Sequence, residues 1–150
     1  PARTIEPTLA AVMATPHLKS GLLSVIALDD WSVVKTVKTP GPGFFMRSHE
    51  NSPFAWTDGM MGPTKDTMAI LDKRTLEIVR TVTPSPGKTA AHVEFDRTGG
   101  KVLVSIWEDP GELVVYDAAT FVELKRLPMR KPSGKYNVFN KINFSDGTSH

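Results

Sequence analysis

Apolar and polar positions follow a regular pattern along the chain, which is clearest over Gly111–Leu127. An apolar run from Leu113 to Tyr116 is followed by the polar stretch 117–120, and alternation then resumes up to Leu127. Because the side chains of a β-strand point alternately to its two faces, this pattern predicts two strands joined by a tight turn, a β-hairpin.

The same hairpin design occurs two more times. Residues 69–82 repeat it closely, and residues 24–37 repeat it with Ala27 in the place of the first turn aspartate. Ala27, Asp72 and Asp117 follow one another at two equal intervals of 45 residues. Repeats of about 40 to 50 residues built from short strands are typical of the blades of a β-propeller. We therefore expect an all-β protein.

The repeat divides the chain into about three blades. We expect a partial blade over 1–39, a blade over 40–83, a blade over 84–130, and a closing strand with a tail over 131–150. The strand around 136–140 has no hairpin partner in the sequence, and a strand with unpaired edges must pair somewhere. Because so few blades cannot close a ring, we expect a fragment of a larger propeller. Alone, its innermost strands would face solvent, which favours marginal stability or self-association, for example as a homodimer.

Composition narrows the classes of function. The 150 residues are 40% hydrophobic, as in ordinary globular proteins, and no apolar run is long enough for a membrane-spanning helix. The net charge of +2 is small and the basic residues are scattered, which argues against a nucleic-acid partner. The absence of cysteine excludes disulfides, thiolate metal sites and covalent c-type haem attachment within the chain. The first residue is Pro1 rather than Met, which fits processing or a longer parent protein.

Four histidines are candidates for proton transfer or metal ligation, since imidazole titrates near neutral pH. In a blade, the turns between blades and those that join the second to the third strand share one face. His92 would lie at that face at the start of an innermost strand, and His17 on the same face farther from the channel. His49 falls in a turn on the opposite face, and His150 is terminal. We therefore expect His92, and after it His17, to belong to a site.

Other residue types suit a flat ligand that carries carboxylates. Met61 lies in a Gly-flanked loop on the site face, where an exposed thioether suits contact with an apolar surface. Arg47 and Lys88, with Lys65, are able to pair with ligand carboxylates, and a solvated loop is the structural alternative. We expect the three tryptophans to be blade-packing residues, because aromatic positions recur in each blade of such folds: Trp31, Trp56 and Trp107.

Several segments together resemble the C-terminal portion of the haem d1 domain of the cytochrome cd1 nitrite reductase family: residues 43–53, residues 102–107 with 113–117, and residues 132–140. The resemblance covers nearly the whole chain, and its most specific part is the closing segment Gly-Lys-Tyr-Asn-Val-Phe-Asn. In that family the domain is an eight-bladed propeller that holds haem d1 in its centre. The resemblance therefore implies a fragment of such a ring, with about three blades and a closing strand.

The resemblance also implies a function for the parent protein. The reductase of this family converts nitrite to nitric oxide in the periplasm during denitrification, with electrons from a c-type cytochrome domain or protein. Its haem d1 iron takes an axial histidine, and distal histidines donate protons to nitrite. By resemblance, His92 would be an iron ligand or a distal acid–base group and His17 a second catalytic histidine. Arg47, Lys88 and Met61 would contact haem d1.

Departures from the reductase pattern leave alternatives open. The proximal ligand and the c-haem motif would lie upstream of Pro1, so we expect the chain alone to be inactive and its parent to be an oxidoreductase. His92 and the segment Ala14-Thr15-Pro16-His17 are closer to paralogues of haem d1 biosynthesis, including the dihydro-haem d1 dehydrogenase. Our main interpretation is a nitrite reductase segment. The alternative is a biosynthesis paralogue, and the second alternative is a propeller that only binds other proteins.

Overall fold

The structure, a computed structural model, describes residues 11–134, 139–140 and 145–146. These residues form strands and turns without a helix, as expected for an all-β protein. The strands are β1 (Val12–Pro16), β2 (Leu22–Ala27), β3 (Val33–Lys38), β4 (Met46–Ser48), β5 (Phe54–Asp58), β6 (Met68–Asp72), β7 (Glu77–Val82), β8 (Ala90–Phe95), β9 (Lys101–Ile106), β10 (Gly111–Asp117), β11 (Glu123–Met129), β12 (Phe139–Asn140) and β13 (Ser145–Asp146). A helix long and apolar enough to cross a membrane is not found in this part of the chain.

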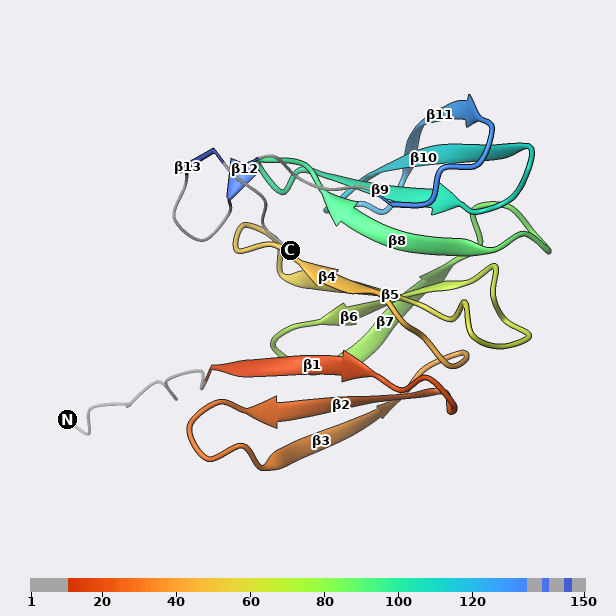
Figure 1. The fold of residues 1–150 in the computed structure, drawn as a ribbon. Coiled ribbons are helices and arrows are strands. Elements are labelled where there is room, and N and C mark those ends of the chain that lie inside the picture. The colour runs from red at the N-terminus through yellow and green to blue at the C-terminus, as the bar shows by residue number, and fades with distance from the viewer. Residues whose placement is uncertain (1–10, 135–138, 141–144, 147–150) are drawn as a thin grey trace.

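Three antiparallel sheets lie one above another (Figure 1). The first consists of β1 to β3, the second of β4 to β7 and the third of β8 to β11, and in each sheet the strands pair in chain order. This up-and-down order is that of propeller blades. The second and third sheets are four-stranded, whereas the described first sheet lacks an innermost strand. The predicted fold class, an all-β propeller fragment, is confirmed.

The outer hairpins of the three sheets have the same turn, repeated every 45 residues. Trp31, Leu76 and Phe121 have positive φ angles of 62°, 57° and 63°, and each donates its N–H to the carbonyl four residues earlier. The register of each strand pair also shifts once shortly before the turn, again at equivalent positions. Since a positive φ is uncommon for a residue with a side chain, its threefold occurrence identifies one structural repeat.

The turn aspartates account for the polar stretch within each hairpin. The Oδ1 atom of Asp72 accepts the N–H groups two and three residues later at 2.7 and 3.2 Å. Asp117 accepts the corresponding N–H groups at 2.9 and 2.8 Å. Ala27 has no such acceptor, and in its hairpin Asp30 instead accepts the N–H of Ser32 at 2.9 Å. The first hairpin therefore keeps its shape with a different side chain in the capping role.

Apolar side chains between adjacent sheets form two core clusters. The cluster between the second and third sheets includes Trp56 and Phe95, which are almost fully buried. The cluster between the first and second sheets includes Leu23 and Leu71. Trp56 therefore packs between blades as predicted, whereas Trp31 is 68% exposed and has no such packing within the described residues.

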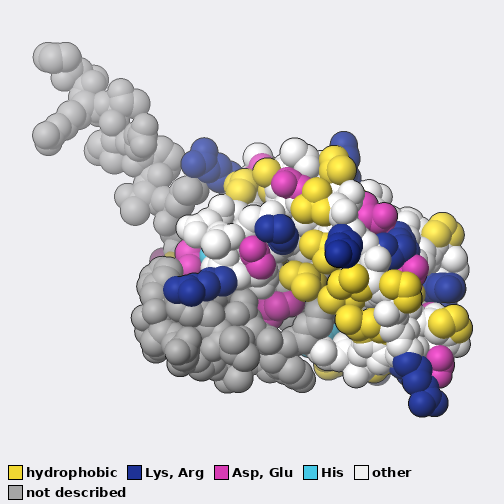
Figure 2. Space-filling view, turned by 90° about the horizontal axis from the view of Figure 1, so that it is seen from above, with side chains coloured by type: hydrophobic (Ala, Val, Ile, Leu, Met, Phe, Trp, Pro, Cys, Tyr) yellow, Lys and Arg dark blue, Asp and Glu magenta, His cyan; other side chains and the backbone are white. Residues whose placement is uncertain are grey.

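The outer face of the third sheet is not covered by another sheet in the described part of the chain. Figure 2, which views the molecule from this side, shows hydrophobic side chains gathered among Lys and Arg. On β11 and its turn, Val122 and Leu124 are 58% and 52% exposed. Val79, 45 residues before Leu124, is 49% exposed as well, so exposure at this position is common to the outer hairpins.

The strands of the three outer hairpins fall within or close to the predicted repeats 24–37, 69–82 and 111–127, whereas β8 begins at Ala90, two residues before His92, which was expected at its start. All residues of β8 are buried, so no alternation marks its ends. Phe139–Asn140, expected to lack a hairpin partner, forms β12 and pairs with β13. Residues 136–138 of the expected closing strand lie outside the described residues.

Candidate functional site

The loops at one end of the sheets, on the right in Figure 1, form a surface that we call the site face. They are the connections from β3 to β4 and from β7 to β8, and the loops from β5 to β6 and from β9 to β10. The Thr64 hydroxyl donates to the Pro40 carbonyl at 3.0 Å, and the Gly87 amide donates to Asp66 at 2.8 Å. The inter-blade connections and the second-to-third turns thus share one face, as predicted.

His92 lies on β8 close to the site face and is 5% exposed. Its φ is 52°, and the pairing of β8 with β9 is irregular between Ala91 and Glu94, so the strand bulges at this point. A bulge redirects side chains relative to a regular strand. The imidazole lies edge-on against Phe45, with ring centroids 4.5 Å apart. The backbone therefore sets the direction of the ring that sequence analysis had singled out.

Asp58, a buried carboxylate at the end of β5, holds the backbone around His92. It accepts the N–H of Phe44 at 2.8 Å and that of Phe45 at 3.2 Å, and the amides of Met60 and His92 also donate to it. Burial raises the pKa of Asp58, and these amide hydrogen bonds act in the opposite direction. One carboxylate thus joins three segments of the site face. Sequence analysis did not identify Asp58. The signal that could have indicated it is an acidic residue at the end of an apolar strand, directly before a glycine.

Glu94 is a second buried acidic residue, two positions after His92 on β8. Arg47 on β4 donates to Glu94 Oε2 through Nε and Nη2, both at 3.1 Å. Because β4 and β8 are the innermost strands of adjacent sheets, the ion pair links two blades near the axis. A carboxylate this buried requires such a partner. Arg47, which was predicted to bind a ligand, therefore neutralises Glu94. Sequence analysis did not identify Glu94, although a glutamate that interrupts an apolar strand is a visible signal.

His17 lies in the turn between β1 and β2, on the site face as predicted. Its Nε2 is 2.8 Å from the Ser24 hydroxyl, and its Nδ1 is 3.4 Å from the Ser20 hydroxyl. Its carbonyl accepts the N–H of Gly43 at 3.0 Å, which places it beside the β3–β4 connection. That connection also contains Phe45, the residue against the His92 ring. The two histidines thus share a face, and each ring has its own contacts.

His49 lies at the opposite end of the sheets and is 3% exposed. Its Nδ1 accepts the N–H of Asn51 at 3.1 Å, and its Nε2 donates to the Arg97 carbonyl at 3.0 Å. The Gly99 Cα lies against the same ring, where an added Cβ would come within 2.5 Å of Nδ1. His49 therefore joins two turns of adjacent sheets and has a structural role.

Two further predicted residues are accessible on the site face. Met61, in the β5–β6 loop, is 50% exposed. Lys88, in the β7–β8 connection, is exposed as well. Lys65 lies 3.6 Å from the carboxylate of Glu108, whose pKa is lowered mainly by hydrogen bonds from Thr89. Met61 and Lys88 therefore offer an apolar surface and a positive charge to a ligand.

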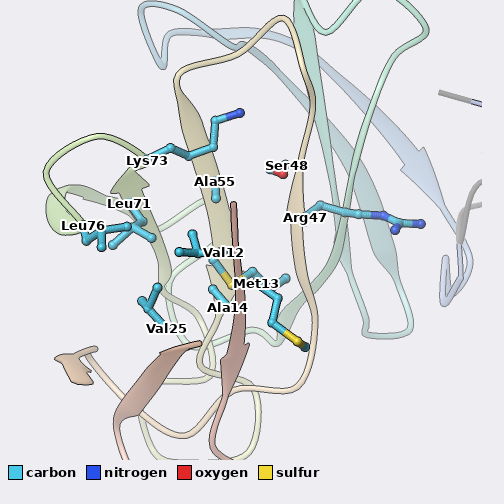
Figure 3. Close-up of a pocket in the computed structure, with 11 residues that line it drawn as sticks. Val12, Met13, Ala14, Val25, Arg47, Ser48, Ala55, Leu71, Lys73 and Leu76 are labelled. Carbon is cyan, nitrogen blue, oxygen red and sulfur yellow. The ribbon is translucent and has the colours of Figure 1, made fainter. Parts of the chain in front are cut away.

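A cavity of about 210 Å³ lies elsewhere, between the first and second sheets. In Figure 3, Val12, Leu71 and Leu76 gather around it, whereas the Arg47 side chain extends away from them. Arg47 is the one predicted site residue that borders it. Over residues 11–134, no three His, Asp or Glu side chains are grouped in a way that would hold a metal ion. The cavity and the site face are thus separate features.

Comparison with known proteins identifies relatives of the chain. Residues 8–141 match the family described as Cytochrome D1 heme domain. The dihydro-heme d1 dehydrogenase of Pseudomonas aeruginosa is 56% identical over 139 residues, which are 93% of this chain and 28% of that protein. The nitrite reductase of Stutzerimonas stutzeri is 28% identical over 175 residues, covering 95% of this chain and 31% of that protein.

Solved structures with a similar fold are found as well. The dihydro-heme d1 dehydrogenase NirN in complex with DHE is 56% identical, with a TM-score of 0.85 over 89% of this chain and 29% of that chain. Hydrazine synthase of Kuenenia stuttgartiensis is 14% identical, with a TM-score of 0.70 over 84% of this chain and 36% of that chain, and supports the fold alone. The chain thus spans less than a third of the length of the curated relatives named above. Because the family match extends over most of its residues, the chain belongs to the cytochrome d1 haem domain family.

Proposed function

We propose that this chain is part of a haem d1 biosynthesis protein of the dihydro-haem d1 dehydrogenase type, in which it contributes to the tetrapyrrole site and supplies an acid–base histidine. The observation that carries the proposal is the 56% identity to the Pseudomonas aeruginosa dehydrogenase, compared with 28% to a nitrite reductase. The reductase was our main interpretation of the sequence, and the comparisons favour the alternative.

The side chains of the site face suit a flat macrocycle that carries carboxylates. Phe44 and Met61 are 52% and 50% exposed and offer apolar contact to a ring surface. Lys88 on the site face offers positive charge to ring carboxylates, and so does Arg47 on the adjoining innermost strand β4, where it also pairs with Glu94. These apolar and basic side chains therefore fit haem d1 or its dihydro form, and we propose all four residues as contacts of the macrocycle.

The proposed reaction removes two hydrogen atoms from the substrate, as two protons and two electrons. We propose that the His92 imidazole accepts one of the two protons, because imidazole exchanges protons near neutral pH, and that the other proton is released to water. The bulge in β8 and the Asp58 carboxylate fix the backbone of His92. A ring fixed in this way needs little reorganisation to receive a proton. The tetrapyrrole supplies the redox chemistry when bound.

The electron acceptor and the compartment belong to the same proposal. On the basis of the family relationship, we propose that a c-type cytochrome domain or protein accepts the electrons and that the protein is located in the periplasm. Fractionation of cells that produce the full-length protein tests the location. Recovery with periplasmic markers supports it, and recovery with cytoplasmic markers contradicts it.

Substrate conversion by the full-length protein tests the proposed function. With dihydro-haem d1 and oxidised cytochrome c in the absence of oxygen, the absorption spectrum should change to that of haem d1 while two cytochromes are reduced per substrate. The second candidate, nitrite reduction, is supported by the 28% identity to the Stutzerimonas stutzeri enzyme. The same protein loaded with haem d1 and given nitrite and a reductant tests it. Nitric oxide release without any dehydrogenation would contradict our proposal.

The variant His92→Asn tests the residue assignment. Asparagine tolerates a positive φ but lacks a titratable ring. We expect the rate of dehydrogenation to fall by about 10²-fold or more and to lose its pH dependence near neutrality, while dihydro-haem d1 still binds. The comparison variant is His17→Asn on the same face, because the resemblance makes His17 a second catalytic candidate; we expect a smaller loss of rate than for His92→Asn because Ser24 and Ser20 hold the His17 ring. Equal losses in both variants would overturn the assignment to His92.

A further inference from the structure

The second and third sheets each lie against the preceding sheet through the positive-φ residue of their outer hairpin. In the third sheet this residue is Phe121, whose ring centroid lies 4.8 Å from that of Phe54 and 5.9 Å from that of Trp56, both on β5. In the second sheet it is Leu76, which packs against the core cluster between the first and second sheets and borders the same cavity as Val12 on β1 (Figure 3). In both cases the turn residue of one blade faces the second strand of the blade before it.

The residues on the preceding blade that face these turn residues also occupy repeated positions. Trp56 is paired with Ile70, and Ala14 is paired with Val25, which stands 45 residues before Ile70. Trp56 and Ala14 therefore occupy equivalent positions on the second strands of adjacent blades. By the same pairing, Phe54 and Val12 are equivalent. In each interface, the preceding blade thus presents two side chains that are two residues apart and point to the same face of one strand.

A basic residue on the fourth strand completes each contact. The Arg80 guanidinium lies 5.6 Å from the centroid of the Phe121 ring. Lys35, 45 residues before Arg80, donates to the carbonyl of Thr75 at 3.2 Å, next to Leu76. In both interfaces a cation on the last strand therefore reaches over to the turn of the following blade.

Residue size explains the cavity between the first two sheets. Where the second and third sheets meet, the contact is made by Phe54, Trp56 and Phe121. The equivalent residues between the first and second sheets are Val12, Ala14 and Leu76, which are smaller and all border the cavity of about 210 Å³. We therefore interpret this space as a loosely filled interface of the same kind.

Trp31 is the third member of the series. It has the same positive φ of 62° and the same backbone hydrogen bond as Leu76 and Phe121, yet it is 68% exposed. We infer that Trp31 is the contact residue for a further blade that precedes the first sheet in the full-length protein. That blade presents two apolar or aromatic side chains, two residues apart on its second strand, and a basic residue on its fourth strand that lies over the indole ring.

The direction of the two existing contacts identifies this occupant. Both are made within one polypeptide, from a blade to its immediate predecessor, and the same rule applied to the first sheet requires a preceding blade. The chain covers 29% of the solved dehydrogenase chain that it matches, which leaves polypeptide for further blades. This inference is independent of the proposed enzymatic activity.

Hydroxyl-radical footprinting of the full-length protein tests the inference on the native fold. We expect Trp31 to be oxidised about as slowly as Trp56, which is fully buried, and more slowly than the partly buried Trp107. Oxidation of Trp31 faster than that of Trp107 would overturn the inference. Protection of Trp31 that disappears on dilution would also overturn it, because the occupant would then be a second copy of the protein.

Three substitutions in the full-length protein provide a second measurement. Trp31→Ala should lower the thermal midpoint of unfolding by a similar amount to Phe121→Ala, whose ring is in the established interface. The matched control is Val34→Ala, because Val34 and its equivalents Val79 and Leu124 are exposed in all three sheets. Val34→Ala should leave the midpoint unchanged. A midpoint for Trp31→Ala equal to that of the control would contradict the proposed contact.

Discussion

At the scale of single residues, the geometry of the site face depends most on Asp58. Its carboxylate receives backbone amides from the β3–β4 connection, the β5–β6 loop and β8, so it fixes both Phe45 and His92, whose rings are in contact. The position of the His92 ring is therefore a property of the backbone network around it.

Asp58→Asn tests this network. Phe44 and Phe45 donate to different oxygens of the carboxylate, so the amide nitrogen of asparagine would face one of these donors in either orientation. We expect the free energy of unfolding to fall by about 1 to 3 kcal/mol, measured by denaturant unfolding of the full-length protein. The control is Asp72→Asn, where both turn hydrogen bonds go to Oδ1 and asparagine can replace them.

The pH dependence of the same variant has a defined sign. Because the pKa of Asp58 is raised in the folded state, its favourable contribution is fully present below the ordinary carboxyl pKa and is lost as the pH rises through the raised value. The variant cannot ionise at this position. The advantage of wild type over Asp58→Asn should therefore narrow as the pH rises through that range, and an advantage that widens would contradict the assignment.

At the residue scale, the location of a side chain in the fold could be predicted where its position along the chain was informative, and its role in binding or catalysis stays a prediction. His92 was expected on the site face because it stands near the start of an innermost strand, and Met61 because it lies in a loop flanked by Gly59 and Gly62. Asp58 and Glu94 were missed because their roles depend on which amides and guanidinium groups come together in space. The exposure of Trp31 was also unexpected, since a sequence pattern predicts a packing position without showing whether its partner is present.

At the scale of elements, the outer hairpin is the unit that the chain repeats. Its positive-φ residue, its bulge and its aspartate cap recur at the same positions, and Ala27 shows that the hairpin also forms without the aspartate. The cap therefore adds stability to a hairpin whose shape is set by the strand pairing and by packing on the preceding blade.

Asp117→Ala tests the contribution of the cap. The carboxylate accepts the amides of Ala119 and Thr120 and the Thr120 hydroxyl, and these bonds lower the pKa of Asp117. Its stabilising effect is present above the ordinary pKa and is lost as the pH falls through the lowered value. We expect a lower thermal midpoint at neutral pH, with a difference from wild type that shrinks in acid. Asp117→Asn, which keeps the acceptor oxygen, should stay near wild type, and equal midpoints for Asp117→Ala and wild type would refute the cap.

Strand boundaries were predictable for hairpins and less so for innermost strands. The bounds of β5, β6 and β7 could be predicted because polar turns and alternation mark them. β8 is buried along its whole length and is interrupted by a bulge, so neither alternation nor register could be inferred from the sequence.

At the scale of the whole molecule, the three sheets are one sector of a ring. Within residues 11–134, Trp31 is exposed and no other sheet covers the outer face of the third sheet (Figure 1). The relatives are more than three times as long as the matched segment, which leaves sequence for further blades beside the first sheet and beside the third sheet. The site face would then be one part of the wall around a central ligand, with other blades supplying the remainder.

The location of the ligand site is tested most directly by hydrogen–deuterium exchange of the full-length protein with and without dihydro-haem d1. The proposal predicts slower exchange on binding in peptides that cover 42–45, 59–62 and 88–94, which contain the site-face loops and His92. Turns at the opposite end, 49–53 and 96–100, should not change. Binding that is evident in the absorption spectrum but protects only the opposite turns, or no part of this chain, would contradict the assignment of the site face.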